Sequence, residues 1–177
     1  RLLGRALTLH TRLSDGSAHR RSAYVRRALS LGSDGGFARY RLIVVPWLWF
    51  TTRSSYNRVF QEKTVQQIID LVFAGYPEVA AWRWSDEVAA FMADTRPRSY
   101  CVQFGESDYQ FLSRLLAEEG LGWKVEDDPE APGGHRIAIV GEFEAQPVQP
   151  LVVDIPGNAP RLREHVHALL RVAFVLV

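Results

Sequence analysis

In this 177-residue chain, the side chains that catalysis or metal binding would use belong to Cys101, Ser107 and the pair His165 and His167. A cysteine becomes a nucleophile when a nearby base takes its proton, and no histidine stands near Cys101 in the sequence. Cys101 precedes Val102 in a strand-like stretch, so we expect a small buried apolar side chain there. His165 and His167 are two residues apart in a stretch of helical character, where they would point apart, which disfavours a zinc site. The sequence therefore predicts no catalytic residue, no metal ligand and no cofactor.

Ser107 has a structural explanation. The segment Gly105–Tyr109 lacks the second glycine of the G-x-S-x-G turn that presents a hydrolase nucleophile. Ser107 instead stands three residues before Gln110, which is the spacing of a helix capping box. The positions after it have the spacing of one apolar helix face: Phe111, Leu112, Leu115 and Leu116. Gly120 then predicts the end of the helix.

A second amphipathic helix is predicted from Thr64, because Thr64 and Gln67 repeat the capping-box spacing. Its apolar stripe consists of Val65, Ile68, Ile69 and Val72, and Gly75 with Pro77 would end it.

Most of the remaining segments have strand character. Two strands, over 23–31 and 37–45, flank the glycine-rich turn 32–36 and predict an antiparallel hairpin that Pro46 ends. In the first of these strands we expect Ala23, Val25, Leu29 and Leu31 to share one face. Further strands are expected over 2–11, 122–126 and 135–140, with a short strand at Trp82–Trp84 and a helical turn at 86–92. Two helices among antiparallel strands indicate the α+β class.

Charge is divided unevenly along the chain although the net charge is +1. Residues 1–60 hold eleven arginines and two acidic residues, and residues 61–177 carry the compensating negative charge. A basic half would suit nucleic acid, but arginines that alternate along strands are also ordinary surface residues. One cysteine excludes an intrachain disulfide framework. No apolar run is long enough for a transmembrane helix, and residues 1–9 do not form a signal peptide.

Three motifs follow one another along residues 1–140. Their positions are Pro46, Trp47, Arg58, Phe60, Gln61, Thr64, Gln103, Glu106, Ser107, Asp108, Phe111, Arg114, Leu115, Glu119 and Gly120. These motifs, in this order, resemble those of the VgrG family, the spike proteins of type VI secretion that are related to phage tail hubs. Phe104 departs from the family's usual tyrosine.

The resemblance implies a non-enzymatic, hub-like domain whose antiparallel strands form barrel-like sheets with two inserted helices. It implies a homotrimer that joins a hexameric tube protein to a needle domain or effector, without nucleic acid or a small-molecule substrate. It also implies assembly in the bacterial cytoplasm and later secretion. We expect residues 1–146 to form part of the hub-like domain, and we leave residues 147–177 unassigned, as a truncated or altered C-terminal segment.

Two other functions stay open at this stage. One is a small hydrolase-like effector domain that would use Cys101, His135 or the histidines near residue 165. The other is a nucleic-acid-binding module built on residues 1–60. Arg114 stands among apolar helix positions, and we expect it to reach Glu118 one turn later or a partner chain.

Overall fold

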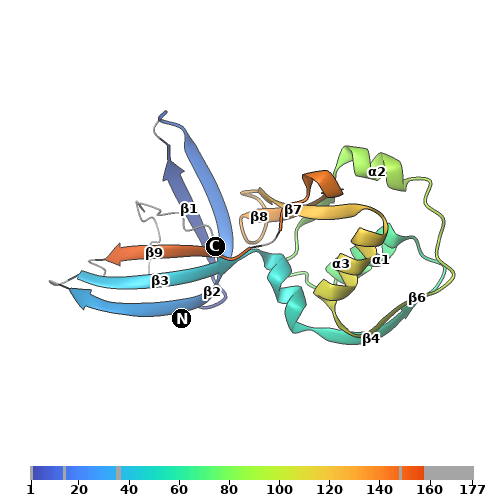
Figure 1. Cartoon of the computed structure of the whole chain (residues 1–177), viewed down its shortest axis with the longest axis horizontal. Helices are drawn as coiled ribbons and strands as arrows, with labels where there is room; N and C mark the ends of the chain where they lie inside the picture. Colours follow the sequence, from blue (N-terminus) through green and yellow to red (C-terminus); the bar gives the residue numbers. More distant parts are fainter. Residues whose placement is uncertain (1, 14, 35–36, 148, 158–177) are drawn as a thin grey trace. The chain divides into compact units, whose positions relative to one another are not determined.

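The computed structural model describes residues 2–13, 15–34, 37–147 and 149–157. Strands and helices alternate irregularly along them (Figure 1). The strands are β1 (Ala6–Arg12), β2 (Ala18–Asp34), β3 (Phe37–Val45), β4 (Ser55–Phe60), β5 (Trp82–Trp84), β6 (Cys101–Ser107), β7 (Leu121–Asp127), β8 (His135–Gly141) and β9 (Leu151–Gly157). The helices are η1 (Trp47–Arg53), α1 (Val65–Phe73), α2 (Asp86–Met92), α3 (Asp108–Glu118) and η2 (Glu142–Glu144).

The chain divides into two compact units. The first, unit 1, combines Arg1–Pro46, Asp127–His135 and Gln149–Val177. The second, unit 2, combines Trp47–Glu126 and Arg136–Val148. Each unit therefore draws on segments that are far apart in the sequence.

Unit 1 is built on a four-stranded antiparallel sheet in the order β1-β2-β3-β9. The long strand β2 pairs through its first half with β1 and through its second half with β3 (Figure 1). One face of this sheet carries the apolar core of the unit: Leu7, Leu9, Val25, Leu42, Val44, Val153 and Ile155.

A bulge in β2 alters the side-chain alternation that the sequence predicts. The pairing register with β3 shifts between Val25 and Arg27. A bulge adds one residue to one strand and so reverses which face the following side chains occupy. Ala23 and Val25 lie on the core face, whereas Leu31 is exposed. The expectation that Ala23, Val25, Leu29 and Leu31 share one face was therefore wrong beyond Val25.

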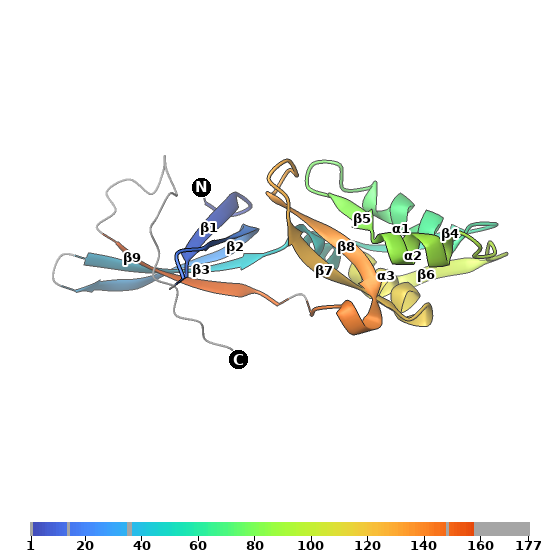
Figure 2. The same cartoon turned by 90° about the horizontal axis from the view of Figure 1, so that it is seen from above.

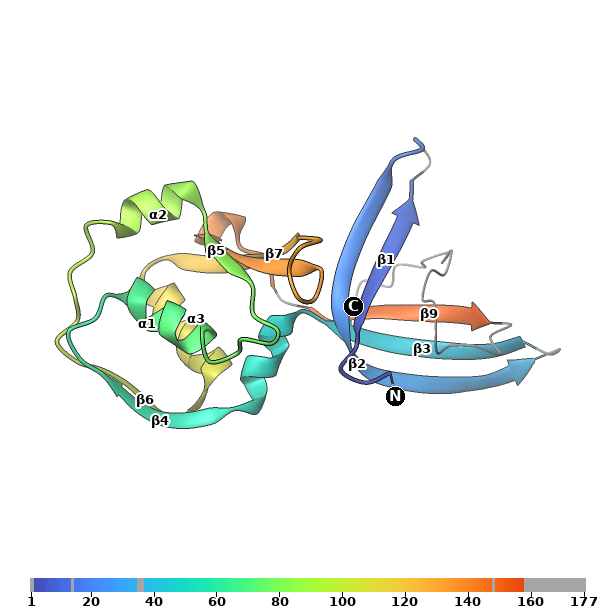
Figure 3. The same cartoon turned by 180° about the vertical axis from the view of Figure 1, so that it is seen from behind.

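Unit 2 has three layers. Helices α1 and α3 lie between a two-stranded ribbon, β4 with β6, and a three-stranded sheet in the order β5-β8-β7 (Figures 1 and 3). The three strands lie side by side in that order in Figure 2. The helices bury both of their apolar stripes, and the largest fully buried side chains of the unit are Trp47, Leu48, Ile68, Ile69, Phe73, Phe111, Leu112, Leu115, Leu116, Ile137 and Ile139.

Both predicted amphipathic helices are confirmed. Helix α1 begins after Thr64 and α3 begins after Ser107, and each start shows the complete capping box. Gly120 has φ +68°, the left-handed conformation that ends a helix and that glycine adopts at little cost. The α+β class with antiparallel sheets is likewise confirmed.

Other features differ from the expectation. The sequence analysis missed β4 and β9, and β5 pairs with β8 in parallel rather than antiparallel. The described strands form open sheets, and none of these sheets closes into a barrel. Strand β9 lies within residues 147–177, which the sequence analysis left unassigned, and the proposed domain boundary at residue 146 stays a prediction. Within the described residues, no helix has the length and apolar character required to span a bilayer.

Replacing Leu115 with aspartate tests the central position of α3. Leu115 is 0% exposed, so the Leu115→Asp change places an unpaired charge in the core and should destabilise the fold by about 3 kcal/mol or more. Urea unfolding followed by circular dichroism measures the effect. Phe91→Asp is the matched control, because Phe91 on α2 is exposed. Equal midpoints for the two variants would show that this face of α3 is not core.

Candidate functional site

The candidate site is a network of polar side chains buried between the β4–β6 ribbon and the start of α3. At its centre is the carboxylate of Asp108, which is 1% exposed. Isolated buried charges are costly, so such a carboxylate requires both a cation and hydrogen-bond donors. Two consecutive elements place it there: β6 ends at Ser107, which caps α3, and α3 begins with Asp108 itself.

Three side chains from different elements satisfy this carboxylate. Arg58 on β4 pairs with Oδ1 of Asp108 and donates through Nε to Oε1 of Gln103 at 2.8 Å. Gln103 Nε2 donates to Oδ1 of Asp108 at 2.8 Å and to the carbonyl of Glu106 at 3.0 Å. The hydroxyl of Tyr76 donates to Oδ2 of Asp108 at 2.7 Å. The carboxylate thus ties together β4, β6, α3 and the segment after α1.

The network changes the titration of Tyr76. Burial, followed by the hydrogen bond to the Asp108 carboxylate, raises the pKa of Tyr76 from 10.0 to about 12, because both disfavour the phenolate. A hydrogen bond with Ser54 opposes the shift. The neutral phenol is therefore the form that the folded unit holds as a donor.

Arg114 lies at the edge of the same ribbon. It pairs with Glu118 at 3.2 Å one helical turn along, which is one of the two alternatives expected from the sequence. It also pairs with Glu106 at 2.6 Å, which the sequence did not predict. Its Nη2 also donates to the carbonyl of Val102 at 3.1 Å, which places the guanidinium against β6. The hydrogen bond to Glu106 is the largest cause of a raised pKa of Arg114, and the pair with Glu118 adds to this shift. Arg98 extends the cluster by pairing with Glu118 and Glu119 at 2.6 and 2.7 Å.

The aromatic positions of the family motifs pack beneath this network. Phe60 stacks on Phe111 with the ring centroids 5.6 Å apart. Trp47 is 0% exposed, contacts Phe73 edge-on at 5.0 Å and donates its indole N–H to the carbonyl of Ala81 at 2.9 Å. These rings hold the ribbon and the helices in contact through a hydrocarbon core.

The remaining motif positions have separate, local roles. Gln61 is exposed just after β4, and Pro46 is buried at the end of β3. The motif residues Arg58, Gln103, Glu106, Ser107, Asp108 and Arg114 are brought together, whereas Pro46, Gln61 and Thr64 lie outside this cluster.

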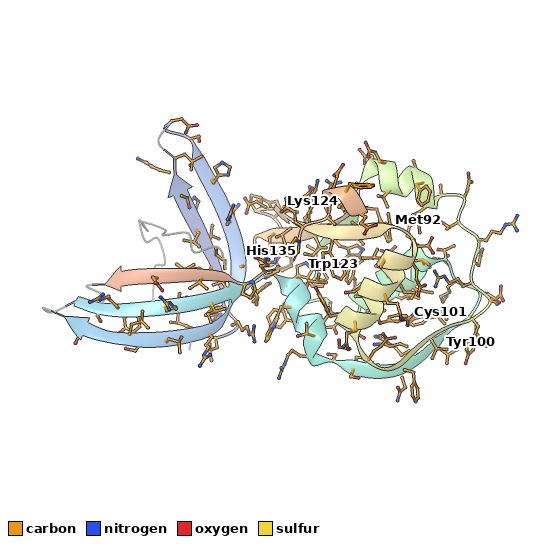
Figure 4. All side chains as sticks on the ribbon, viewed as in Figure 1. Met92, Tyr100, Cys101, Trp123, Lys124 and His135 are labelled. Atoms are coloured by element: carbon orange, nitrogen blue, oxygen red, sulfur yellow. The ribbon has the colours of Figure 1, made fainter. Side chains whose placement is uncertain are left out.

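The candidate nucleophile is buried, and the described residues contain no candidate metal cluster. Cys101 at the start of β6 is 6% exposed, as expected of a small apolar side chain (Figure 4). His135, in unit 1, is 1% exposed, and burial lowers its pKa. No group of three or more His, Cys, Asp or Glu side chains within the described ranges is arranged to hold a metal ion. His165 and His167 lie outside the described residues.

Several polar contacts of unit 2 were missed by sequence analysis. Tyr76 stands beyond the end of α1, and nothing in its spacing points to Asp108. Asp70 on α1 accepts the indole N–H of both Trp82 and Trp84 at 2.8 and 3.0 Å. The period-two spacing of the two tryptophans was visible in the sequence, but their shared acceptor was not.

Removing the central carboxylate should destabilise unit 2. Asp108→Ala leaves the Arg58 and Gln103 side chains without their buried partner, which typically costs about 3–5 kcal/mol. The matched control is Asp154→Ala, because Asp154 pairs with Arg41 on an exposed surface, where such pairs contribute about 0–1 kcal/mol. Chemical denaturation of both variants measures the difference. Similar losses in the two variants would contradict the central role of Asp108.

Alkaline pH should weaken unit 2 through Tyr76. Its pKa in the folded state exceeds that of the unfolded chain, so its contribution is fully present below pH 10.0 and is lost as the pH rises through about 12. Unfolding free energies measured between pH 9 and 12 should fall less for Tyr76→Phe than for the parent chain. Tyr100→Phe, at an exposed position, is the control and should follow the parent. A Tyr76→Phe variant with the same decline as the parent would remove this assignment.

Comparison with known proteins places this geometry in a family. Residues 1–175 match the sequence profile of the phage tail baseplate hub (GPD) family. The chain is 30% identical over 163 residues to the type VI secretion system spike protein VgrG1b of Pseudomonas aeruginosa, covering 92% of this chain and 21% of that protein. It is 35% identical over 172 residues to VgrG1a of the same organism, covering 93% and 25%. The chain thus spans a quarter or less of the length of these relatives.

A solved structure agrees on the fold. An E. coli component of the type VI secretion system, described as structurally similar to the T4 bacteriophage tail proteins gp27 and gp5, superposes with a TM-score of 0.58. The match covers 73% of this chain and 35% of the other, at 22% identity. The profile match over nearly the whole sequence and the two spike relatives together show that this chain belongs to the phage tail baseplate hub family and is related to the VgrG spike proteins.

Proposed function

We propose that this chain forms part of the hub of a type VI secretion spike and acts as a structural adaptor between the tube and the needle. The observation that carries the proposal is the family match over residues 1–175, together with spike relatives that cover more than nine tenths of the chain. In the hub, three copies would assemble and contact a hexameric tube protein. Such a protein would be assembled in the bacterial cytoplasm and then secreted.

The motif residues would serve the hub by fixing its shape. Arg58, Gln103 and Asp108 tie the β4–β6 ribbon to α3, and a fully satisfied buried network makes one arrangement of these elements much more stable than others. We propose that they are structural rather than catalytic residues. An adaptor that transmits force between protein rings requires this rigidity more than it requires a reactive group.

A structural role also suits the residues first considered for chemistry. Cys101 and His135 are both buried and so are poorly placed to meet a substrate. One relative is named as the actin cross-linking toxin VgrG1 of Vibrio cholerae, and the match covers 54% of this chain but 8% of that protein. Enzymatic activity in a longer parent protein is therefore compatible with a non-enzymatic hub segment.

The basic half of the chain finds anionic partners within the fold. Arg41 pairs with Asp154 at 2.6 Å, Arg20 lies 3.5 Å from Asp127, and Arg58 is held by Asp108. These pairs reduce the positive potential that nucleic acid would require and so favour the hub over a nucleic-acid-binding module.

The solution mass of the purified chain tests the proposal. We expect light scattering to give either three times the 20.1 kDa of the chain or a complex with the hexameric tube protein of the same organism. Bovine serum albumin in place of the tube protein controls for non-specific association. A mass of one chain, both alone and with the tube protein, would contradict assembly through these residues.

A further inference from the structure

The loop that joins β7 to β8 belongs to unit 1, where residues 127–135 lie against the face of β2 that is turned away from the apolar core. Two glycines allow this close approach. A Cβ at Gly133 would lie 2.5 Å from Cε2 of Tyr24, and a Cβ at Gly134 would lie 2.7 Å from Oγ of Ser22. Both β2 side chains are buried, at 6% exposed. The loop therefore occupies a closely fitted seat on β2.

An imidazole is enclosed in this seat. His135, at the start of β8, is 1% exposed and contacts the ring of Tyr24 edge-on, with the ring centroids 5.8 Å apart (Figure 4). Its Nδ1 lies 2.9 Å from the carbonyl oxygen of Gly133. A carbonyl only accepts, so Nδ1 carries the proton of the neutral ring and donates it to this bond. A second proton would therefore be taken up at Nε2.

Protonation would place a cation in the seat. The charged and titratable groups on the elements that form the seat, or next to it in the chain, are Tyr24 and Arg20 on β2, His10 opposite Arg20 on β1, Asp127 at the end of β7, Asp128 and Glu130 in the loop, and the mutually paired Glu126 and Arg136. Asp127 attracts the ring, but it already holds Arg20 at 3.5 Å and accepts from Ser22 at 3.4 Å. Burial is the largest effect on the pKa of His135 and lowers it, against the hydrogen bond to Gly133 and the charge of Asp127. A buried cation without a partner of its own is unstable, so protonation opposes the closed loop.

From the glycine-fitted seat and the enclosed imidazole together, we propose that residues 127–135 form a pH-sensitive latch, in which a proton taken up at Nε2 of His135 drives the ring out of the seat and releases the loop from β2. The released ring binds a proton more readily than the buried one. The latch is therefore fully closed above pH 6.5, the ordinary histidine value, and weakens as the pH falls below it toward the lower pKa of the buried ring. This device acts within unit 1 and goes beyond the proposed hub function, because it operates whether or not the chain trimerises.

A cysteine placed beneath the loop measures its opening. Ser22→Cys introduces a thiol that methyl methanethiosulfonate reaches only when the loop lifts, and Ser17→Cys supplies an exposed reference thiol. Both changes are made in the full chain with Cys101→Ala, so that a single thiol reacts. The ratio of the two labelling rates gives the fraction of open loop at each pH, because the pH dependence of thiolate formation affects both rates.

Two histidine variants form the matched test of the trigger. In the parent chain, we expect the labelling ratio to rise about tenfold for each pH unit below 6.5, until the ring in the closed loop itself titrates. His135→Phe keeps a ring against Tyr24 but takes up no proton, so its ratio should stay constant between about pH 8 and pH 5. His19→Phe, at an exposed position on β2, should keep the rise seen in the parent.

Two glycine variants test the fit of the seat at neutral pH. Gly133→Ala brings a Cβ against the ring of Tyr24 and should raise the labelling ratio about tenfold or more without any change of pH. Gly141→Ala is the matched control, because no atom lies within 4 Å of the Cβ that it adds, and it should leave the ratio unchanged. Circular dichroism checks that each variant is folded.

The possible results separate the latch from its alternatives. A rise with acid that persists in His135→Phe would assign the trigger to another group, such as Asp127, and would overturn the proposal. A constant ratio in the parent, or an unchanged ratio in Gly133→Ala, would overturn it as well. If a variant does not fold, an NMR titration of the parent chain decides, because the signals of Gly133 and Gly134 should follow the ring of His135 at one midpoint. None of these measurements depends on trimer or tube binding, so failure here leaves the proposed hub function intact.

Discussion

The buried carboxylate of Asp108 is the constraint on which unit 2 depends. A charge that is 1% exposed is stable only if several donors converge on it, and those donors come from β4, β6 and the segment after α1. The start of α3, the pairing of the ribbon and the position of Tyr76 are therefore linked. Apolar packing of Phe60 on Phe111 adds stability beneath the network, but it does not by itself select one register.

The same geometry explains how motif residues as densely polar as those of an active site can stabilise a fold. Gln103, Glu106, Ser107, Asp108 and Arg114 stand within twelve residues. Each has a partner within the fold: Gln103 and Asp108 bond to each other, Ser107 caps α3, and Arg114 holds Glu106. Such a network specifies one arrangement of the chain, which is what the proposed hub role would require of it.

The two faces of the β4–β6 ribbon differ in character. Its inner face carries the Arg58 and Gln103 network against α3, and its outer face leaves Val59 and Phe104 exposed. Period-two alternation allows both, because successive side chains of a strand point to opposite faces. A glycine bulge, with Gly105 at φ +63°, sits where the register shifts and lets β6 turn directly into α3.

Local chemistry in the sequence was sufficient for the two capped helices, the hairpin of β2 and β3 and the α+β class. Capping boxes and apolar stripes depend on neighbours three or four residues apart, so they can be read from the chain alone. The motif resemblance likewise identified the family before any geometry was known.

The sequence missed β4 and β9, the parallel pairing of β5, and the reversal of side-chain faces at the β2 bulge. Only the tertiary structure brought Tyr76 to Asp108 and both Trp82 and Trp84 to Asp70. Those contacts join residues that are 12 to 32 positions apart in the sequence. The pairing of strands and the hydrogen bonding of a buried charge depend on such distant partners rather than on local spacing.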